Sequence, residues 1–157
     1  MYLEVPVSTQ VVTVHYLNTW SECMKLTNQH VMDALSGLNE LSNEKFPAKL
    51  AWKIQTARLS LEPFAKTMNE QMGTLRDKFA VKDAEGNFVP GVNEKGEPVE
   101  GTIHIGREHV VVFNKELEDL MGLEVEVNNV SIDIADFPDS IEVSPNSLHA
   151  LRGILVG

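Results

Sequence analysis

The sequence predicts an α+β fold with an N-terminal strand-like arm, a long antiparallel helical hairpin, and a small antiparallel sheet with a short inserted helix and a C-terminal helix. Three observations predict this class. The chain has 157 residues, enough for one compact domain and too few for two ordinary ones. Apolar residues recur every three or four positions in the first half, as in amphipathic helices. In the second half, short apolar segments alternate with polar and turn residues, which is typical of strands with one solvated face.

The chain divides into an N-terminal arm, residues 1–23, and a single α+β domain, residues 24–157. The arm has no Lys or Arg, and many of its apolar residues alternate at period two, as in a half-buried strand; among them are Val5, Val7 and Val11. The composition changes at Met24, which resembles a translation start of its own. We therefore expect the arm to be an appendage that is able to add to the sheet edge of another subunit.

Residues 27–80 are predicted to form the helical hairpin. Thr27 is a suitable N-cap for a first helix that ends near Leu41, and Leu26 and Val31 occupy the two positions of a hydrophobic staple. Because two consecutive amphipathic helices joined by a short loop pack against each other, we expect them to be antiparallel.

The second helix of the hairpin carries the longest periodic stripe in the sequence, from Pro47 to Phe79. Pro63 lies inside this stripe. Proline lacks the backbone donor and crowds the carbonyl four residues earlier. The sequence therefore predicts a kink or a break near residues 59–63.

The β-rich acidic half, residues 81–157, begins with a weak internal repeat over residues 81–99. Each copy is predicted to be a short strand, a polar turn with a left-handed glycine, and a second short strand, with Gly86 and Gly96 at the glycine positions. The spacing after Asp83 does not match a calcium-binding EF-hand loop, because the glycine is misplaced.

The remaining elements of this half are predicted from periodicity and capping. They are strands at residues 103–105, 110–113 and 123–134, a short helix over residues 115–121 after the cap Asn114, and a terminal helix that opens at Ser144-Pro145.

The net charge of −10 is confined to the second half of the chain. Residues 1–80 contain eight acids and eight bases, whereas residues 81–157 contain fifteen acids and five bases. Proteins that bind nucleic acids gain most of their affinity from clustered Lys and Arg. The charge pattern therefore argues against DNA or RNA as a direct partner.

The sequence contains no recognised catalytic, metal or nucleotide motif, and we expect neither an enzyme nor a bound cofactor. His104 and His109 are five residues apart, which fits no helical zinc pair. No apolar run reaches the roughly 20 residues of a transmembrane helix, and the N-terminus lacks the pattern of a secretory signal, so neither a membrane nor export is expected.

Three lysines at four-residue spacing, Lys45, Lys49 and Lys53, are predicted to lie on one side of the long helix. Such a row usually serves solubility. Its alternative role is to bind an acidic partner, including the acidic half of a neighbouring copy.

Several segments resemble an uncharacterised family of small tailed-bacteriophage and prophage proteins, over residues 24–152 or so. The segments that carry the resemblance are residues 24–28, 46–53, 82–86, 113–120 and 124–127, and the helix that opens at Ser144-Pro145. The resemblance implies a phage origin, and no catalytic motif accompanies it. The N-terminal 23 residues and Pro63 depart from the family pattern.

Three hypotheses for function follow. The first is a non-enzymatic phage protein that acts through protein–protein contacts as a virion structural or assembly component, with homo-oligomers among its states. The second is a phage inhibitor of a host defence system that uses the acidic half. The third is an enzyme whose site is unrecognised. The first two place the protein in the host cytoplasm, and the first also in the virion.

Overall fold

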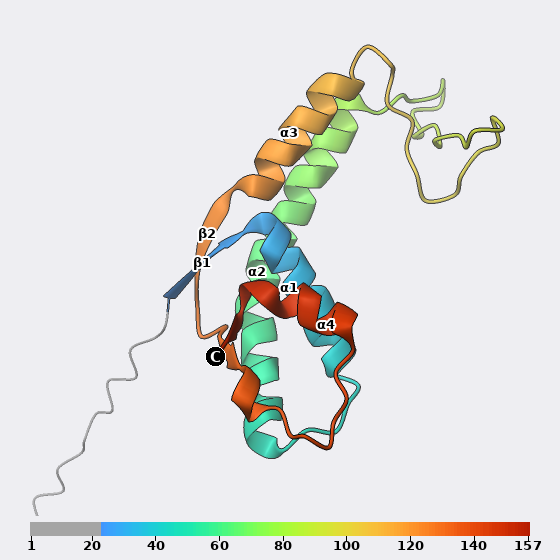
Figure 1. The fold of residues 1–157 in the computed structure, drawn as a ribbon. Helices are drawn as coiled ribbons and strands as arrows, with labels where there is room; N and C mark the ends of the chain where they lie inside the picture. Colours follow the sequence, from blue (N-terminus) through green and yellow to red (C-terminus); the bar gives the residue numbers. More distant parts are fainter. Residues whose placement is uncertain (1–22) are drawn as a thin grey trace, which may run out of the picture.

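A computed structural model describes residues 23–157 of the chain. The fold is α+β, as predicted (Figure 1). Its elements are β1 (Cys23–Thr27), α1 (Asn28–Leu41), α2 (Ala48–Phe79), α3 (Val110–Gly122), β2 (Glu124–Asn128), β3 (Ile132–Asp133), α4 (Pro145–Ala150) and β4 (Leu155–Val156), with 3-10 turns at Ile134–Asp136 and Leu151–Gly153.

The first strand pair joins the start of the domain to its second half. β1 and β2 pair antiparallel, with Leu26 opposite Val125 and Met24 opposite Val127. The sequence predicted β2 but not β1, which lies in the stretch expected to lead directly into the first helix. Only one of its five residues is buried, and five residues are too few to give a clear period-two signal.

The helical hairpin forms as predicted, with α1 and α2 packed side by side (Figure 1). The Thr27 side chain caps α1 by accepting a hydrogen bond from the backbone N–H of His30 at 3.2 Å. Leu38, Leu50 and Leu61 from the two helices are fully buried between them and the rest of the domain.

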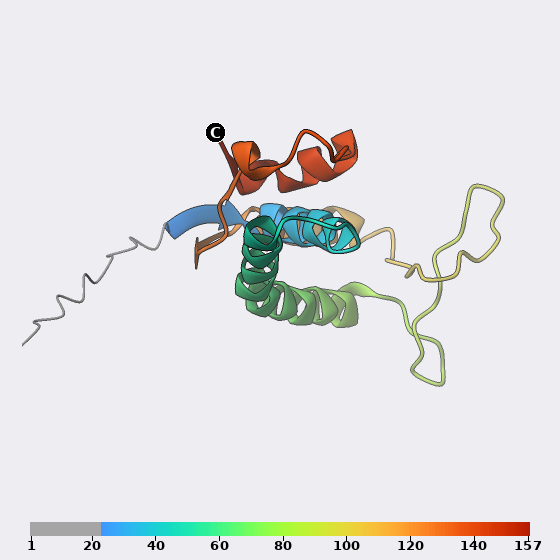
Figure 2. The ribbon, with the colours of Figure 1, turned by 90° about the horizontal axis from the view of Figure 1, so that it is seen from below.

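Pro63 does not break α2, which is continuous from Ala48 to Phe79. The helix does change direction near its middle, as the two differently oriented segments of α2 in Figure 2 show. The expected break is therefore wrong and the expected kink is present. A proline within a helix costs one hydrogen bond, and packing on both sides of Pro63 is sufficient to keep the helix continuous.

Between α2 and α3 the chain makes a long excursion away from the helices (Figure 1). Two hairpin turns repeat within it at a spacing of ten residues. The side chains of Asp83 and Asn93 each accept hydrogen bonds from two backbone N–H groups of their own turn. Gly86 and Gly96 follow with φ of 86° and 80°, so the predicted left-handed glycines are confirmed. The flanking strands are reduced to isolated bridges, Lys82 with Phe88 and Val92 with Pro98.

The segment predicted as a strand at residues 110–113 is instead the first turn of α3. β-branched residues favour strands only weakly. Here the aromatic ring of Phe113 packs on Phe79 of α2, with ring centroids 5.9 Å apart, and this tertiary contact favours the helix. The helix consequently begins four residues before the predicted cap, Asn114.

The C-terminal segment closes the domain. Ser144 caps α4 as predicted, accepting a hydrogen bond from the backbone N–H of Ser147 at 3.0 Å. β3 and β4 form a parallel pair, whereas only antiparallel pairing was expected. The crossover through α4 returns the chain to β3 in the same direction, and this permits the parallel arrangement.

The hydrophobic core lies in one part of the molecule. Its fifteen buried residues all come from positions 26–65 or 127–154. Residues 66–123, which we call the projection, contribute none of them and contain the second half of α2, the excursion and α3. We call the remainder of residues 23–157 the body.

A candidate protein-binding groove

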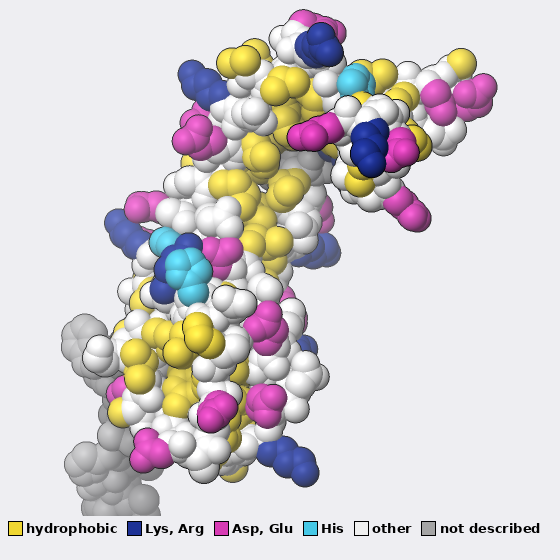
Figure 3. Space-filling view, turned by 45° about the vertical axis from the view of Figure 1, so that its right-hand side comes forward, with side chains coloured by type: hydrophobic (Ala, Val, Ile, Leu, Met, Phe, Trp, Pro, Cys, Tyr) yellow, Lys and Arg dark blue, Asp and Glu magenta, His cyan; other side chains and the backbone are white. Residues whose placement is uncertain are grey.

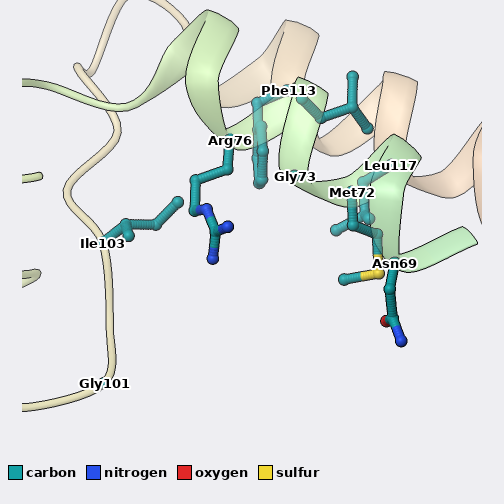
Figure 4. Close-up of a pocket in the computed structure, with 9 residues that line it drawn as sticks. Asn69, Met72, Gly73, Arg76, Gly101, Ile103, Phe113 and Leu117 are labelled. Atoms are coloured by element: carbon teal, nitrogen blue, oxygen red, sulfur yellow. The ribbon is translucent and has the colours of Figure 1, made fainter. Parts of the chain in front are cut away.

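The projection carries a groove between α2, α3 and the end of the excursion. The groove has a volume of about 420 Å³ and nine lining residues. Met72, Phe113 and Leu117 form its apolar side, and Ile103 faces them from the excursion (Figure 4). Glycines leave part of its walls open: no atom lies within 4 Å of the position of a Cβ atom at Gly101, and at Gly73 the nearest is the Arg76 guanidinium group at 3.9 Å.

Local contacts hold the two helices that form the groove. Phe79 and Phe113 meet edge to face near the end of α2. Beside them, the Lys78 ammonium group binds the Glu116 carboxylate at 2.7 Å. The excursion is held to itself by backbone hydrogen bonds, including those of His104 with Val81 and Val89. These contacts fix α2, α3 and residue 103 as three sides of one concavity.

Arg76 is the single charged residue among those that line the groove. Its guanidinium group lies 5.4 Å from the centroid of the Phe88 ring, and within residues 23–157 it forms no ion pair. In Figure 4 the side chain extends from α2 toward the open space beside Ile103. The groove therefore offers an apolar surface with one free positive charge, on a protein whose net charge is −10.

Apolar side chains are exposed more in the projection than in the body. Nine of the fourteen large hydrophobic residues that are exposed lie within residues 66–123, among them Met72, Phe88 and Val111. Figure 3 shows the apolar surface as a band along the upper part of the molecule. Not one residue of α3 is fully buried. Contiguous exposed apolar surface is typical of contact sites for proteins, membranes or ligands.

Two neighbouring hollows on α3 differ from the groove in charge. One lies along Leu75 and Leu120 and contains Glu116 and Asp119. The other lies against α1 and contains Glu118. Of these three hollows, the groove is the one that suits an apolar ligand with a negative charge.

The three predicted docking lysines do not form one row on the helix. Lys45 precedes α2 and lies in the connection after α1. Lys49 and Lys53 both bind the carboxylate of Asp136, Lys49 at 3.0 Å, and these contacts, that of Lys53 first, lower the pKa of Asp136. Two of the lysines thus bind the acidic half of their own chain. The other predicted contact residues, Val5, Val7 and Val11, lie outside the described residues.

The histidines and acids considered in the sequence are dispersed. His109 lies against the Phe79 ring, with centroids 5.9 Å apart, and His104 lies in the excursion. From Cys23 to Gly157, no three His, Cys, Asp or Glu side chains come close enough together to hold a metal ion. Within the same range, no helix combines the length and hydrophobicity needed to cross a membrane.

Sequence reasoning did not find the groove, although one signal for it exists. α2 has 32 residues and α1 has 14, so much of the apolar stripe of α2 extends beyond its hairpin partner. The run Val110–Phe113 supplies the missing partner, but its composition suggests a strand. The difference in helix length could have indicated a second packing partner for α2, but the identity of that partner depends on tertiary structure.

The fold and groove define a small α+β protein with a candidate protein-binding surface on a two-helix projection. Comparison with protein-family models, with curated proteins and with solved structures gave no match to the chain.

Proposed function

We propose that this chain is a non-enzymatic phage protein that acts through protein–protein contacts, as a structural or assembly component of the virion. The observation that carries the proposal is the projection. The main core cluster has no member between residues 65 and 127, Met68 and Phe79 are the buried hydrophobic residues of the described part there, and nine large apolar residues of this region are exposed. Exposed apolar surface lowers solubility unless another molecule covers it, so a projection of this kind is best explained by a binding partner. The phage assignment rests on the resemblance of residues 24–152.

Two of the three lysines of the predicted docking row are engaged within their own chain, which favours contacts with other proteins elsewhere on the surface. Lys49 and Lys53 are occupied by Asp136 of the same chain, so the lysine row contributes to the fold of the monomer. Contacts with other proteins are then expected to use the groove and the exposed residues of the projection.

A second candidate function, inhibition of a host defence system, is favoured by the charge of residues 81–157, with fifteen acids and five bases. In this case the acidic half would cover a basic cleft of the host protein. Part of that charge is neutralised within the chain, because Asp136 and Glu116 bind lysines of α2.

The test is to follow the protein through infection by the phage that encodes it, with an affinity tag at the C-terminus. We expect it to copurify with particles or with assembly intermediates at a fixed stoichiometry, measured by quantitative mass spectrometry. A charge-neutral groove variant, Met72→Gln, should be depleted from those particles, whereas Val111→Gln, exposed but outside the groove, should be retained.

The competing outcome is equally specific. Absence from particles and intermediates, together with a defined complex with one host nuclease or defence protein, would replace the first function by the second. In that case, substitution of acids in the excursion should weaken the complex, and Met72→Gln should leave it intact.

A further inference from the structure

The groove needs an occupant with apolar side chains and a negative charge, and the chain contains such a segment. Residues 1–22 have no Lys or Arg, and their acidic residues are Glu4 and Glu22. Around Glu4 the sequence is apolar at alternate positions, with Leu3, Val5 and Val7. An extended segment of this pattern places these three side chains on one face and Glu4 on the other.

We infer that the N-terminal segment, residues 1–22, of a second copy of the chain occupies the groove. The inference rests on the proposed function, since it names the contact through which copies associate. The face with Leu3, Val5 and Val7 would cover Met72, Phe113 and Leu117 on the helices. Glu4, on the opposite face, would turn toward the excursion side of the groove, where the guanidinium group of Arg76 extends beside Ile103.

Charge selects this groove among the hollows of the projection. The hollow beside Leu120 contains two acids, Glu116 and Asp119, and the one beside Met121 contains Glu118. An arm that carries Glu4 would be repelled there, because a like charge near a contact opposes binding. In the groove it meets the one lining residue that is charged, and that charge is positive.

The direction of β1 indicates that the segment in the groove comes from a second copy and not from the same chain. β1 ends at Thr27, next to α3, since the N–H of Asn28 donates to the carbonyl of Leu123. Its other end, Cys23, pairs with Asn128, at the end of β2 that is remote from α3. The chain before Cys23 therefore starts from the end of the strand pair away from the projection and would have to reverse to enter its own groove.

The length of the segment is sufficient. A chain of 22 residues spans at most about 75–80 Å when extended, and α3, with 13 residues, is about 20 Å long. One copy can thus reach across a neighbour and still cover the groove. Mutual exchange of two arms gives a closed dimer with twofold symmetry.

A charge exchange tests the contact in the full chain. We expect a dimer by light scattering, and each of Arg76→Glu and Glu4→Arg should weaken dimerisation by about tenfold or more, because each places like charges together. The double variant, Arg76→Glu with Glu4→Arg, should restore it. Arg107→Glu is the matched control, since Arg107 is an exposed arginine of the same projection that does not line the groove.

A disulfide experiment distinguishes the second copy from the same chain. In a Cys23→Ser background, one batch carries Leu3→Cys and another carries Asn69→Cys, at the edge of the groove. On mild oxidation, a mixture of the Leu3→Cys and Asn69→Cys proteins should form a disulfide-linked heterodimer. A mixture of the Leu3→Cys and Val111→Cys proteins should form much less of it. A single chain with both substitutions that forms the link within itself as a monomer would overturn the inference.

Other results also decide the question. A monomeric full chain, a dimer indifferent to both charge reversals, or a double variant as weak as the single ones would contradict the inference. A monomer that is nevertheless present in particles would refute the arm exchange and leave the proposed function standing. A dimer of the expected charge dependence that is absent from particles and assembly intermediates would refute the function and leave the exchange standing.

Discussion

The body and the projection use helices of similar composition for different purposes. In the body, α1 and the first half of α2 bury several leucines and alanines, among them Leu38, Leu61 and Ala34. In the projection, the second half of α2 buries Met68 and Phe79, no residue of α3 is fully buried, and Met72 and Val110–Val112 are exposed. The difference predicts that the body supplies most of the stability of the fold, and it agrees with our proposal that the projection is a binding surface.

The largest expected effect comes from a core truncation in the body. Leu38 is 0 % exposed, so Leu38→Ala should lower the free energy of unfolding by about 2–5 kcal/mol, through lost burial and the cavity left behind. Val111 is 78 % exposed, so Val111→Ala should change it by no more than about 0.5 kcal/mol. Urea unfolding followed by circular dichroism measures both. Equal losses would show that stability is shared evenly between the two regions.

A glycine in each region gives the next comparison, in which the same substitution should have opposite signs. A Cβ atom at Gly37 would meet the Leu151 side chain at 3.0 Å, so Gly37→Ala should destabilise the body by about 1–3 kcal/mol. At Gly73 the nearest atom is 3.9 Å away, so Gly73→Ala should stabilise α2 by up to about 1 kcal/mol. Thermal unfolding of the two variants measures both changes in stability. Changes of the same sign would show that the two helices do not differ in packing at these glycines.

The turns of the excursion should respond locally. Gly86 has φ of 86° and no atom near its missing side chain, so Gly86→Ala costs about 1 kcal/mol of backbone strain without a clash. We expect faster amide hydrogen exchange within residues 81–89 and unchanged exchange in α1. Faster exchange throughout the body would mean that the excursion is part of the same cooperative unit.

The smallest effect is a pH dependence in the body. Hydrogen bonds from Lys53 and Lys49 lower the pKa of Asp136 below its ordinary range, so the folded state favours the ionised carboxylate. Its contribution to stability is complete above the unfolded pKa of about 4 and is lost as the pH falls through the folded pKa. The wild-type chain should therefore lose stability as the pH falls below about 4, and the Asp136→Asn variant should lose less over the same range. The same slope in both proteins would exclude Asp136 as its source.

Sequence reasoning recovered what local patterns determine. The caps Thr27 and Ser144, the two turn glycines and the helical stripe of α2 each have a short-range physical cause, and each was predicted. The features that it missed depend on distant contacts. β1 exists because β2 returns beside it, and Val110–Phe113 is helical because Phe113 packs on Phe79.

The candidate site was predicted least well for the same reason. The lysine row has correct spacing for a helix face, but Lys45 falls before the helix and Asp136 reaches back across more than 80 residues to bind the other two. The groove combines residues of α2, α3 and the excursion, and no one segment contains a motif for it. The relevant sequence signal was the mismatch in length between the two helices of the hairpin.

One measurement tests most directly whether stability and binding lie in different regions: parallel unfolding and light-scattering experiments on Met72→Lys, with Val111→Lys as the control. Both residues are exposed, at 37 % and 78 %, and Met72 alone of the two lines the groove. We predict that both variants unfold within about 0.5 kcal/mol of the wild-type chain at concentrations where it is monomeric. Only Met72→Lys should abolish self-association. Self-association that survives Met72→Lys, or a loss of stability as large as that from Leu38→Ala, would contradict the assignment of binding to the projection.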